Sequence, residues 1–376
     1  MTQQEAPQGQ RHLLHVFASF GYGGVPIRIC DVINGLPAGF RHTVVALDGC
    51  FDAGKRLAPG MAVAFETLTL PKYNLLASML QVRGLLRRQA PDLLLTYNWG
   101  AIEVALANCV MGGCAHIHFE SGFGAEEGDG QIGRRNLFRR LALARSRKLV
   151  VPSATLVKIA EDAWQVPAGK LQQIVNGVDD RRYSGRAGRR EAFLAYSVAE
   201  GVTVIGTAAP LRPEKNVARL LRAFAALPDR DTAVLVIAGD GVQRAQLQDL
   251  AVELGIAEAT HFLGHVEDVP ALLRSFDIFA LSSDTEQMPN SLLQAMAAGR
   301  PVAAVDVGDV AVMVAPENRP LIVPRDGEGA LTAALAELLN DPARRERLGR
   351  LNQDRVAAQF SMDGMIAAYA ELFTAG

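Results

Sequence analysis

One stretch in the second half of the chain, Ser282–Pro301, combines a carboxylate, amides and the start of a helix. Glu286 lies in the loop that follows an apolar run, and Asn290 or Ser291 is expected to cap the helical pattern that comes next. Gln294 lies one helical turn beyond Asn290 and therefore on the same face. The N–H groups at the start of such a helix can bind phosphate, while a flanking carboxylate and amide can bind sugar hydroxyls. The alternative is a capped helix packed on a strand, which leaves Glu286 and Gln294 without a role.

A second candidate site is the loop that contains Arg212 and Lys215, between the apolar run Val202–Ala208 and the helical pattern Val217–Ala226. Two cations beside the N–H groups of a helix start form a suitable diphosphate site. Cations at this end of a helix oppose its dipole, and a bound anion would remove that conflict. The alternative is a solvated first turn in which Glu214 pairs with one of the two cations.

Glycines follow the first apolar run of the chain, His12–Ala18, as Gly21, Gly23 and Gly24. Glycine lets the backbone approach a ligand closely, and the helix that starts here would present N–H groups to an anion. A plain tight turn is the alternative. The spacing does not match G-x-G-x-x-G, which argues against a dinucleotide site.

The segment between Gly130 and Val150 carries cations and no acidic residue. As a basic amphipathic helix over 134–148 it would rest on anionic lipid or receive an anionic, lipid-linked acceptor. An ordinary surface helix, with arginine stems over a core stripe, is the alternative. The cations are Arg134, Arg135, Arg139, Arg140, Arg145, Arg147 and Lys148, interleaved with Leu137, Phe138, Leu141 and Leu143.

Short β-rich runs alternate with longer amphipathic segments along nearly the whole chain, which predicts parallel sheets covered by helices on both faces. Two series of similar length predict two doubly wound domains. The first series covers His12–Ala18, His42–Asp48, Asp92–Asn98, Ala115–Phe119, Lys148–Pro152 and Gln172–Val175. The second covers Val202–Ala208, Ala233–Gly239, Thr260–Leu263, Asp277–Leu281, Pro301–Val305 and Leu321–Val323.

The expected boundary between the domains is the turn Asn176–Asp179, followed by the polar, arginine-rich segment Asp180–Arg190. We expect an N-terminal domain over residues 1–178, a linker over 179–190 and a C-terminal domain over 191–359. An apolar helix at about 360–376 is expected to pack back on the N-terminal domain.

Composition excludes several classes of protein. The 38 basic and 40 acidic residues nearly cancel, so nothing indicates a nucleic-acid-binding protein. The four cysteines form no C-x-x-C and are expected to be free thiols in a reducing compartment. The polar start of the sequence does not resemble a signal peptide, and the uncharged runs are short for a membrane span. We therefore expect a cytoplasmic protein, peripheral on the inner face of the membrane if the basic segment binds lipid.

The Ser282–Pro301 stretch resembles the E-x7-E segment of family 4 retaining glycosyltransferases, which has the form E-x-x-P-N-x-x-L-E-A-M-A-x-G-x-P-V. The residues that match it are Glu286, Pro289, Asn290, Leu293, Ala295, Met296, Ala297, Gly299, Pro301 and Val302. Other segments follow the family's order and spacing: the Gly23-Gly24 loop, Asn176–Asp179, Arg212–Asn216, Ala238–Gly241 and Phe262–His265. The resemblance implies the α/β GT-B fold, with two doubly wound Rossmann-like domains facing across a cleft.

The resemblance also implies an enzyme: a retaining, metal-independent glycosyltransferase of the hexosyltransferase type. It would move a sugar from a UDP- or GDP-sugar to a saccharide or lipid-linked acceptor, with the donor as co-substrate and no other cofactor. Phosphate binding is implied for Lys215, Arg212, Gly23, Gly24 and the N–H groups of Asn290, Ser291 and Leu292. Sugar binding is implied for Glu286 and His118, ribose binding for Gln294, and a place near the base for Val266.

Two departures from the family pattern bear on activity. Gln294 stands where the second acid of E-x7-E is usual; an amide still binds a ribose hydroxyl but removes a negative charge. The arginine that commonly precedes the lysine falls on Pro210, so Arg212 must serve as the second cation. The alternatives are a catalytically impaired sugar-nucleotide-binding protein and a GT-B sugar-nucleotide epimerase. We expect no metal site, since the D-x-D at Asp229–Asp231 falls in a turn between a helix and a strand.

Overall fold

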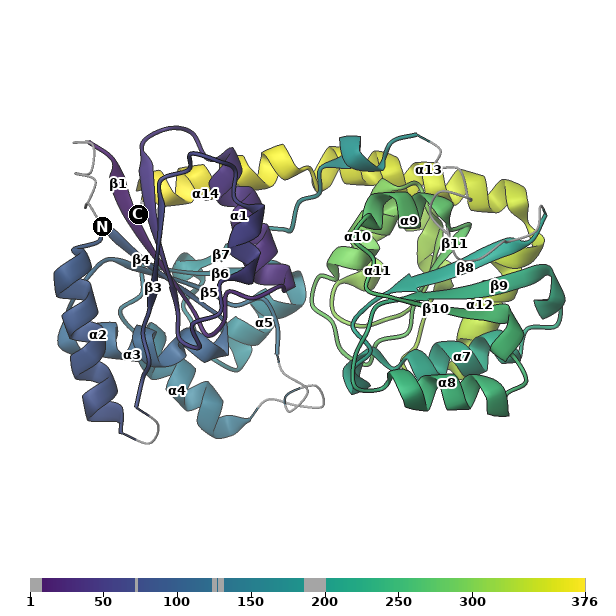
Figure 1. Ribbon diagram of the computed structural model, residues 1–376, viewed down its shortest axis with the longest axis horizontal. Coiled ribbons are helices and arrows are strands. Elements are labelled where there is room, and N and C mark those ends of the chain that lie inside the picture. Colours follow the sequence, from purple (N-terminus) through teal and green to yellow (C-terminus); the bar gives the residue numbers. More distant parts are fainter. Residues whose placement is uncertain (1–8, 72–73, 124–126, 128–131, 186–200, 376) are drawn as a thin grey trace. The chain divides into compact units, whose positions relative to one another are not determined.

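The computed structural model describes residues 9–71, 74–123, 127, 132–185 and 201–375. They form two compact units (Figure 1). Unit 1 comprises Met1–Asn176 together with Asp363–Gly376, and unit 2 comprises Gly177–Met362. In the expected linker, Asp180–Tyr183 forms a 3-10 turn within unit 2, where the Arg182 carbonyl accepts a hydrogen bond from Arg274. Residues 186–190 of that linker lie outside the described residues.

Unit 1 contains a fully parallel sheet in the order β3-β2-β1-β4-β5-β6-β7. Six of its strands were predicted from the sequence, and β3 was missed. Strand β3 lies at the sheet edge with no fully buried residue, so its sequence lacks the apolar run of a central strand. The strands are β1 (Arg11–Phe17), β2 (Phe40–Ala46), β3 (Val63–Thr67), β4 (Leu93–Tyr97), β5 (His116–Phe119), β6 (Lys148–Val151) and β7 (Leu171–Gln173).

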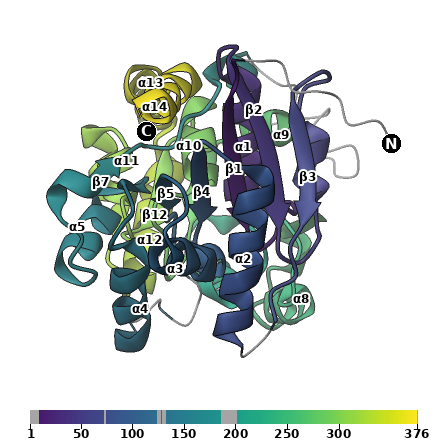
Figure 2. The same ribbon diagram turned by 90° about the vertical axis from the view of Figure 1, so that its left-hand side faces the viewer.

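Helices cover both faces of this sheet. Figures 1 and 2 show α2 (Leu75–Gln89) and α3 (Ile102–Met111) on one side and α14 (Met362–Ala375) on the other. The alternation of side chains along β1 explains this: Leu14 and Val16 join the core under α2 and α3, whereas His15 faces Phe373 of α14. The remaining helices of unit 1 are α1 (Gly24–Gly35), α4 (Gly133–Leu143) and α5 (Ala154–Asp162).

Unit 2 repeats the architecture with a parallel sheet in the order β10-β9-β8-β11-β12-β13. Every strand in the described part of unit 2 was predicted. They are β8 (Thr203–Ala208), β9 (Ala233–Ala238), β10 (Thr260–Gly264), β11 (Ile278–Leu281), β12 (Val302–Val305) and β13 (Ile322–Val323).

One large apolar core of unit 2 lies between the sheet and the helices α7 (Val217–Ala225), α8 (Arg244–Glu253) and α12 (Glu328–Asn340). Its centre includes Ile205, Leu220 and Leu335, none of which is exposed. The helix α10 (Asn290–Ala297) packs against α9 (Val269–Ser275) and α13 (Pro342–Gln359). A short helix, α11 (Val310–Met313), follows β12.

Each sheet has one place where the strand order reverses, between β1 and β4 in unit 1 and between β8 and β11 in unit 2. At such a place the connections from neighbouring strands leave toward opposite faces, and the loops at the carboxyl ends diverge. Ligands of open α/β sheets bind there. The loops that carry the predicted site residues follow these strands: Gly23-Gly24 follows β1, Lys215 follows β8 and Glu286 follows β11.

Among the described residues, no helix combines the length and the apolar character needed to cross a membrane. The four cysteines are free thiols: Cys30 is buried, and Cys50, Cys109 and Cys114 are half-buried. Burial raises the pKa of Cys30 to about 12 and that of Cys114 to about 11, so neither is a thiolate at neutral pH.

Candidate functional site

The reversal point of the unit 2 sheet is marked by an ion pair between Lys215 and Glu286. The Lys215 Nζ lies 2.6 Å from Glu286 Oε1, and the side chains are 21% and 11% exposed. Ser283 Oγ donates a second hydrogen bond to the same carboxylate oxygen, at 2.8 Å. The structure thus brings together the cation and the carboxylate that the sequence singled out from segments 71 positions apart.

Asp284 joins the two loops that carry this pair. Its backbone N–H donates a hydrogen bond to the Glu214 carbonyl (2.9 Å). Its carboxylate accepts hydrogen bonds from the Asn216 side chain and forms an ion pair with Arg219 (2.8 Å). Asn216 has a left-handed backbone, φ 40°, and its side chain caps α7. Arg219, which is nearly buried, also donates to the Ser282 carbonyl. Sequence reasoning missed Asp284 and Arg219, because their role depends on pairing between two loops rather than on a local motif.

Gly308, in the loop after β12, supports the backbone of Glu286. Its φ is +57°, and a Cβ here would lie 2.3 Å from the Glu286 carbonyl oxygen and 2.7 Å from that of Gln287. The next residue, Asp309, donates its backbone N–H to the Gln287 carbonyl at 2.9 Å. Only glycine combines this backbone conformation with such a close approach. Gly308 is therefore a positioning residue for the loop of Glu286.

The helix α10 begins at Asn290, and the prediction that Asn290 or Ser291 caps it was wrong. The residue at the cap position is Pro289, with an extended backbone and no side-chain capping bond, so neither Asn290 nor Ser291 is the cap. Within the helix, Leu293 donates to the Pro289 carbonyl, and the N–H groups of Asn290, Ser291 and Leu292 precede that first turn.

The remaining predicted residues of unit 2 are Arg212, Gln294 and Val266, on three different segments. Arg212 is exposed and starts the 3-10 turn Pro213–Lys215, so it is in the same turn as Lys215. Gln294 lies on α10 and is half-buried, as is Val266 in the loop after β10.

In unit 1, Gly23 and Gly24 lie where α1 begins, directly after β1. Gly23 has an extended backbone, φ −167°, and its carbonyl accepts the first hydrogen bond of the helix, from Ile27. A Cβ on Gly23 would meet only Pro26, at 3.7 Å. The conformation does not itself require glycine here, and the absence of a side chain keeps the backbone accessible.

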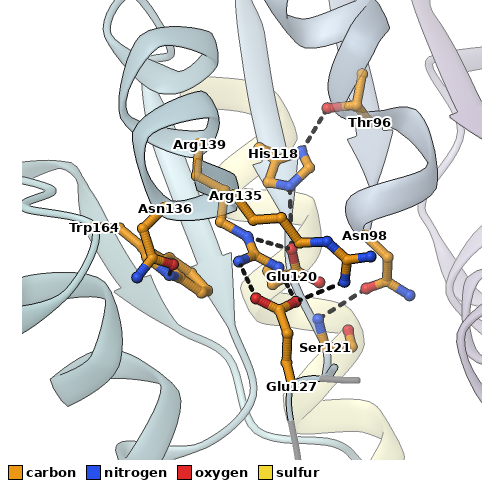
Figure 3. Close-up of polar contacts among 10 residues, drawn as sticks. All are labelled: Thr96, Asn98, His118, Glu120, Ser121, Glu127, Arg135, Asn136, Arg139 and Trp164. Atoms are coloured by element: carbon orange, nitrogen blue, oxygen red, sulfur yellow. Dashed lines mark hydrogen bonds and ion pairs between the residues drawn. The ribbon is translucent and has the colours of Figure 1, made fainter. Parts of the chain in front are cut away.

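His118 lies at the end of β5 and is buried, with 1% of its surface exposed (Figure 3). Its Nδ1 is hydrogen-bonded to Thr96 Oγ1 of β4 at 2.7 Å. Its Nε2 faces the carboxylate of Glu120, 3.8 Å away, and Glu120 has no exposed surface. The structure therefore places His118 in a buried polar cluster. The sequence analysis gave Glu120 no role, although it is only two residues from His118.

The cluster continues through Arg139 of α4, which is buried although it belongs to the predicted basic surface. Arg139 forms two 2.9 Å hydrogen bonds with the carboxylate of Glu127, and Arg135 pairs with the same group at 3.3 Å (Figure 3). The Arg139 guanidinium also lies 4.8 Å from the ring centres of both Trp99 and Trp164. Burial would raise the pKa of Glu127, but the hydrogen bonds and charges of the two arginines lower it.

These contacts correct the expectation for the basic segment. The helix α4 ends at Leu143, so Arg145, Arg147 and Lys148 lie beyond it. Arg139 and Leu143 point inward, and Leu137 and Leu141, 57% and 54% exposed, point outward. Among the described residues, no group of three or more His, Cys, Asp and Glu side chains is arranged to hold a metal ion.

Comparison with known proteins identifies the family. The family described as Glycosyltransferase Family 4 matches residues 22–182, and Glycosyl transferases group 1 matches residues 189–355. The chain belongs to the family 4 glycosyltransferases. Its relatives include the lipopolysaccharide core biosynthesis glycosyltransferase LpsD of Rhizobium meliloti, which is 29% identical over 47% of this chain and 51% of its own. The GDP-mannose-dependent alpha-(1-6)-phosphatidylinositol monomannoside mannosyltransferase of Mycobacterium tuberculosis is 32% identical over 54% of this chain and 56% of its own.

The chain aligns with about half the length of the curated relatives it matches. Solved structures show the same fold along nearly the whole chain. Sucrose-phosphate synthase of Thermosynechococcus elongatus has a TM-score of 0.80 at 19% identity and covers 98% of this chain and 100% of its own. HepE of Anabaena in complex with UDP-glucose has a TM-score of 0.81 at 18% identity, with 97% and 100% covered. The expected GT-B fold, with two Rossmann-like units, is confirmed.

Proposed function

We propose that this protein transfers a sugar from a nucleoside-diphosphate sugar to a saccharide or lipid-linked acceptor. The observation that carries the proposal is the Lys215–Glu286 pair, 2.6 Å apart, at the reversal point of the unit 2 sheet. It lies beside a helix start at which a proline, and no capping side chain, precedes the first N–H groups. A cation, a carboxylate and a helix N-terminus together match a diphosphate attached to a sugar.

The proposed chemistry follows from the charges. When the sugar leaves the donor, negative charge grows on the nucleoside diphosphate, and fixed donors stabilise it in the transition state. Lys215, Arg212 and the N–H groups of Asn290, Ser291 and Leu292 supply these donors. When the diphosphate replaces Glu286 as the ion-pair partner of Lys215, the carboxylate of Glu286 becomes available for the hydroxyls of the transferred sugar. Gln294 is proposed to bind the ribose, and Val266 to lie near the base.

Two finer features belong to the same proposal. Stabilisation by Lys215, Arg212 and helix N–H groups can replace a metal ion at the diphosphate, so we propose metal-independent transfer. We also propose retention of configuration, with the acceptor attacking from the face of the leaving group and the phosphate accepting the acceptor's proton. From unit 1, Gly23 and Gly24 are proposed to approach the phosphates, and His118 the transferred sugar.

The relatives support the class of donor. One is named as a GDP-mannose-dependent mannosyltransferase and one solved neighbour was obtained with UDP-glucose. A third relative, 27% identical over 58% of this chain, is named as a 2-deoxystreptamine N-acetyl-D-glucosaminyltransferase of Streptomyces fradiae. We propose a UDP- or GDP-hexose as donor.

A panel of UDP- and GDP-sugars, screened first by thermal shift and then by turnover, tests the proposal. Slow hydrolysis of one stabilising donor, or transfer to an added acceptor, supports a transferase. An epimerised sugar would indicate an epimerase. Tight binding without any turnover would identify a binding protein, with Gln294 in place of the usual acid as the first residue to restore.

We further propose that a patch of exposed apolar and basic residues on unit 1 rests on anionic lipid, at the cytoplasmic face of the membrane. The patch consists of Val110, Leu137, Leu141, Arg134, Arg140 and Arg145. Arg145 donates to the Cys109 carbonyl and Cys109 Sγ contacts the Leu141 carbonyl, so α3 and α4 contribute to one surface. Exposed apolar side chains together with exposed arginines match the interface of an anionic bilayer.

Liposome flotation tests this patch. Wild-type protein should float with vesicles that contain anionic lipid and not with purely zwitterionic ones. Leu137→Ser combined with Leu141→Ser should abolish flotation, whereas Val242→Ser with Val252→Ser, at exposed positions of unit 2, should not. Equal recovery with both kinds of vesicle would overturn the proposal.

A further inference from the structure

We propose that Thr96 and Glu120 are positioning residues for His118 and hold its imidazole in the tautomer that carries the proton on Nε2. The inference rests on the proposed function only in that His118 is there assigned to the transferred sugar. The supporting observation is that the hydrogen bonds of the buried cluster at the ends of β4 and β5 must share a limited number of protons (Figure 3).

The hydroxyl of Thr96 lies between two imidazoles. Its Oγ1 is 2.7 Å from His118 Nδ1 and 2.8 Å from His116 Nε2. A hydroxyl has one proton, so it donates to only one of these nitrogens, and the other nitrogen must donate to it. Burial and the neighbouring His118 lower the pKa of His116 to about 3, so His116 is neutral and has one N–H. The tautomers of the two histidines are therefore linked through Thr96.

Glu120 decides between the two arrangements. Its Oε2 lies 3.8 Å from His118 Nε2, and Glu120 has no exposed surface. Among the described residues, neither oxygen of Glu120 nor His118 Nε2 has a hydrogen-bond partner. In so buried a place a carboxylate repels a nitrogen lone pair and attracts an N–H. The proton of His118 therefore belongs on Nε2, so that Thr96 donates to Nδ1 and His116 donates to Thr96.

The arginine behind Glu120 keeps this orientation in place. Arg139 Nε lies 3.7 Å from the same Oε2, while the rest of its guanidinium is bound by Glu127. Glu127 also pairs with Arg135, so two cations balance the two carboxylates. Glu120 is the carboxylate of this group that faces His118.

The tautomer defines the ligand group. An Nε2–H donor next to carboxylate acceptors matches a hydroxyl, which both accepts and donates a hydrogen bond. A phosphate oxygen only accepts, and Glu120 would repel its charge. Both side chains are buried in the structure without a ligand, and a group that reaches them must be a hydroxyl, such as one on the transferred sugar, because the pair does not suit a phosphate oxygen.

Nitrogen-15 NMR of histidine-labelled full-length protein at neutral pH tests the tautomer without any ligand. The signal that disappears in His118→Gln is assigned to His118. Nε2 of the wild-type residue should be protonated and Nδ1 should not, and the same pattern should persist in Thr96→Ser. In Thr96→Val the Nδ1 should lose its hydrogen-bond shift. A proton on Nδ1 in the wild-type protein would overturn the inference, whatever reaction the protein catalyses.

Kinetics with a donor from the panel give the second readout. Thr96→Val and Glu120→Gln should each lower kcat about tenfold, and Thr96→Ser should restore most of it. Both variants should lose the extra thermal stabilisation by the nucleotide sugar over the nucleoside diphosphate alone. The matched control is Thr43→Val, because Thr43 makes an equivalent buried hydrogen bond with His12, at 2.8 Å in the same sheet. If Thr43→Val lowers kcat as much as Thr96→Val, the role of Thr96 is merely structural.

Discussion

Lys215 and Glu286 form an ion pair with 2.6 Å between Nζ and Oε1, although each is assigned to a different part of the same donor. Before the donor binds, the two opposite charges therefore neutralise each other in a partly buried environment. A diphosphate then exchanges one anionic partner of Lys215 for another, which limits the cost of desolvating the cation.

The first prediction concerns this pair. Lys215→Ala and Glu286→Ala should each lower kcat/KM tenfold or more, about 1.4 kcal/mol of transition-state stabilisation. The double variant should lose less than the product of the two effects, because each single change leaves the other charge unpaired. Steady-state kinetics with the selected donor measure this. Arg350→Ala, which breaks an exposed pair with Glu346 on α13, is the control and should retain the wild-type rate. Wild-type rates in both site variants would show that the site is elsewhere.

The second prediction concerns Gly308. Gly308→Ala should shift the loop of Glu286, because the new Cβ would lie 2.3 Å from its carbonyl oxygen. We expect a loss of about tenfold or more in kcat/KM and of about 1–3 kcal/mol in the free energy of unfolding. Gly255→Ala is the matched control: φ is +66° there, with no atom within 4 Å, so it adds only the backbone strain. If the two variants behave alike, the close approach at Gly308 has no part in positioning Glu286.

The third prediction concerns Arg139. Arg139→Met should destabilise unit 1 by about 3–5 kcal/mol, because the carboxylate of Glu127 loses both hydrogen bonds from Arg139 while it remains buried. Denaturant unfolding monitored by tryptophan fluorescence is suitable, since Arg139 stacks on Trp99 and Trp164. Arg134→Met, at an exposed position of the same helix, should change stability by less than about 0.5 kcal/mol. Similar losses in both variants would contradict the assignment of Arg139 to the core.

The fourth prediction is a pH dependence of stability. Burial and the charge of His12 lower the pKa of His42 from 6.5 to about 4, and His116 is lowered to about 3. Below pH 6.5 the unfolded chain binds protons that the folded chain does not, so stability is full above this pH and falls as the pH falls toward 4. Each such histidine contributes about 1.4 kcal/mol per pH unit within its window.

Urea unfolding at a series of pH values measures that slope. His42→Gln should reduce it between about pH 4 and pH 6.5, whereas His265→Gln, at an exposed position, should leave it unchanged. An unaltered slope in His42→Gln would mean that His42 is not buried as a neutral group.

The sequence was sufficient for the fold because apolar runs of central strands are unambiguous, and every strand except the half-exposed β3 was found from them. It also singled out Lys215 and Glu286, which the structure brings together, since each lies in a short polar loop after such a run. The contacts of Asp284 and Arg219 that join the two loops could not be predicted from the sequence. They depend on which strands become neighbours in the sheet.

The two wrong predictions, the cap of α10 and the exposure of Arg139, also have physical causes. Asn290 has the side chain of a capping residue, but Pro289 fixes the backbone one position earlier and takes the cap position. The sequence presents Arg139 as a surface cation, whereas its contacts with Glu127 and the two tryptophans account for its burial. A charged residue in the core is visible in a sequence only when its partner is adjacent, and here the partner is 12 positions away.

The helix α14 has a consequence for how the chain is made. Its Phe373 packs on His15, Phe40 and Phe119, and its Tyr369 stacks on Phe119, so it closes one face of the unit 1 core. It follows all of unit 2 in the sequence. A ribosome therefore delivers most of unit 1 first but its closing helix only after unit 2, and domain-by-domain folding during synthesis cannot run to completion in chain order. One apolar face of the nascent unit 1 therefore stays uncovered by α14 until that helix is synthesised.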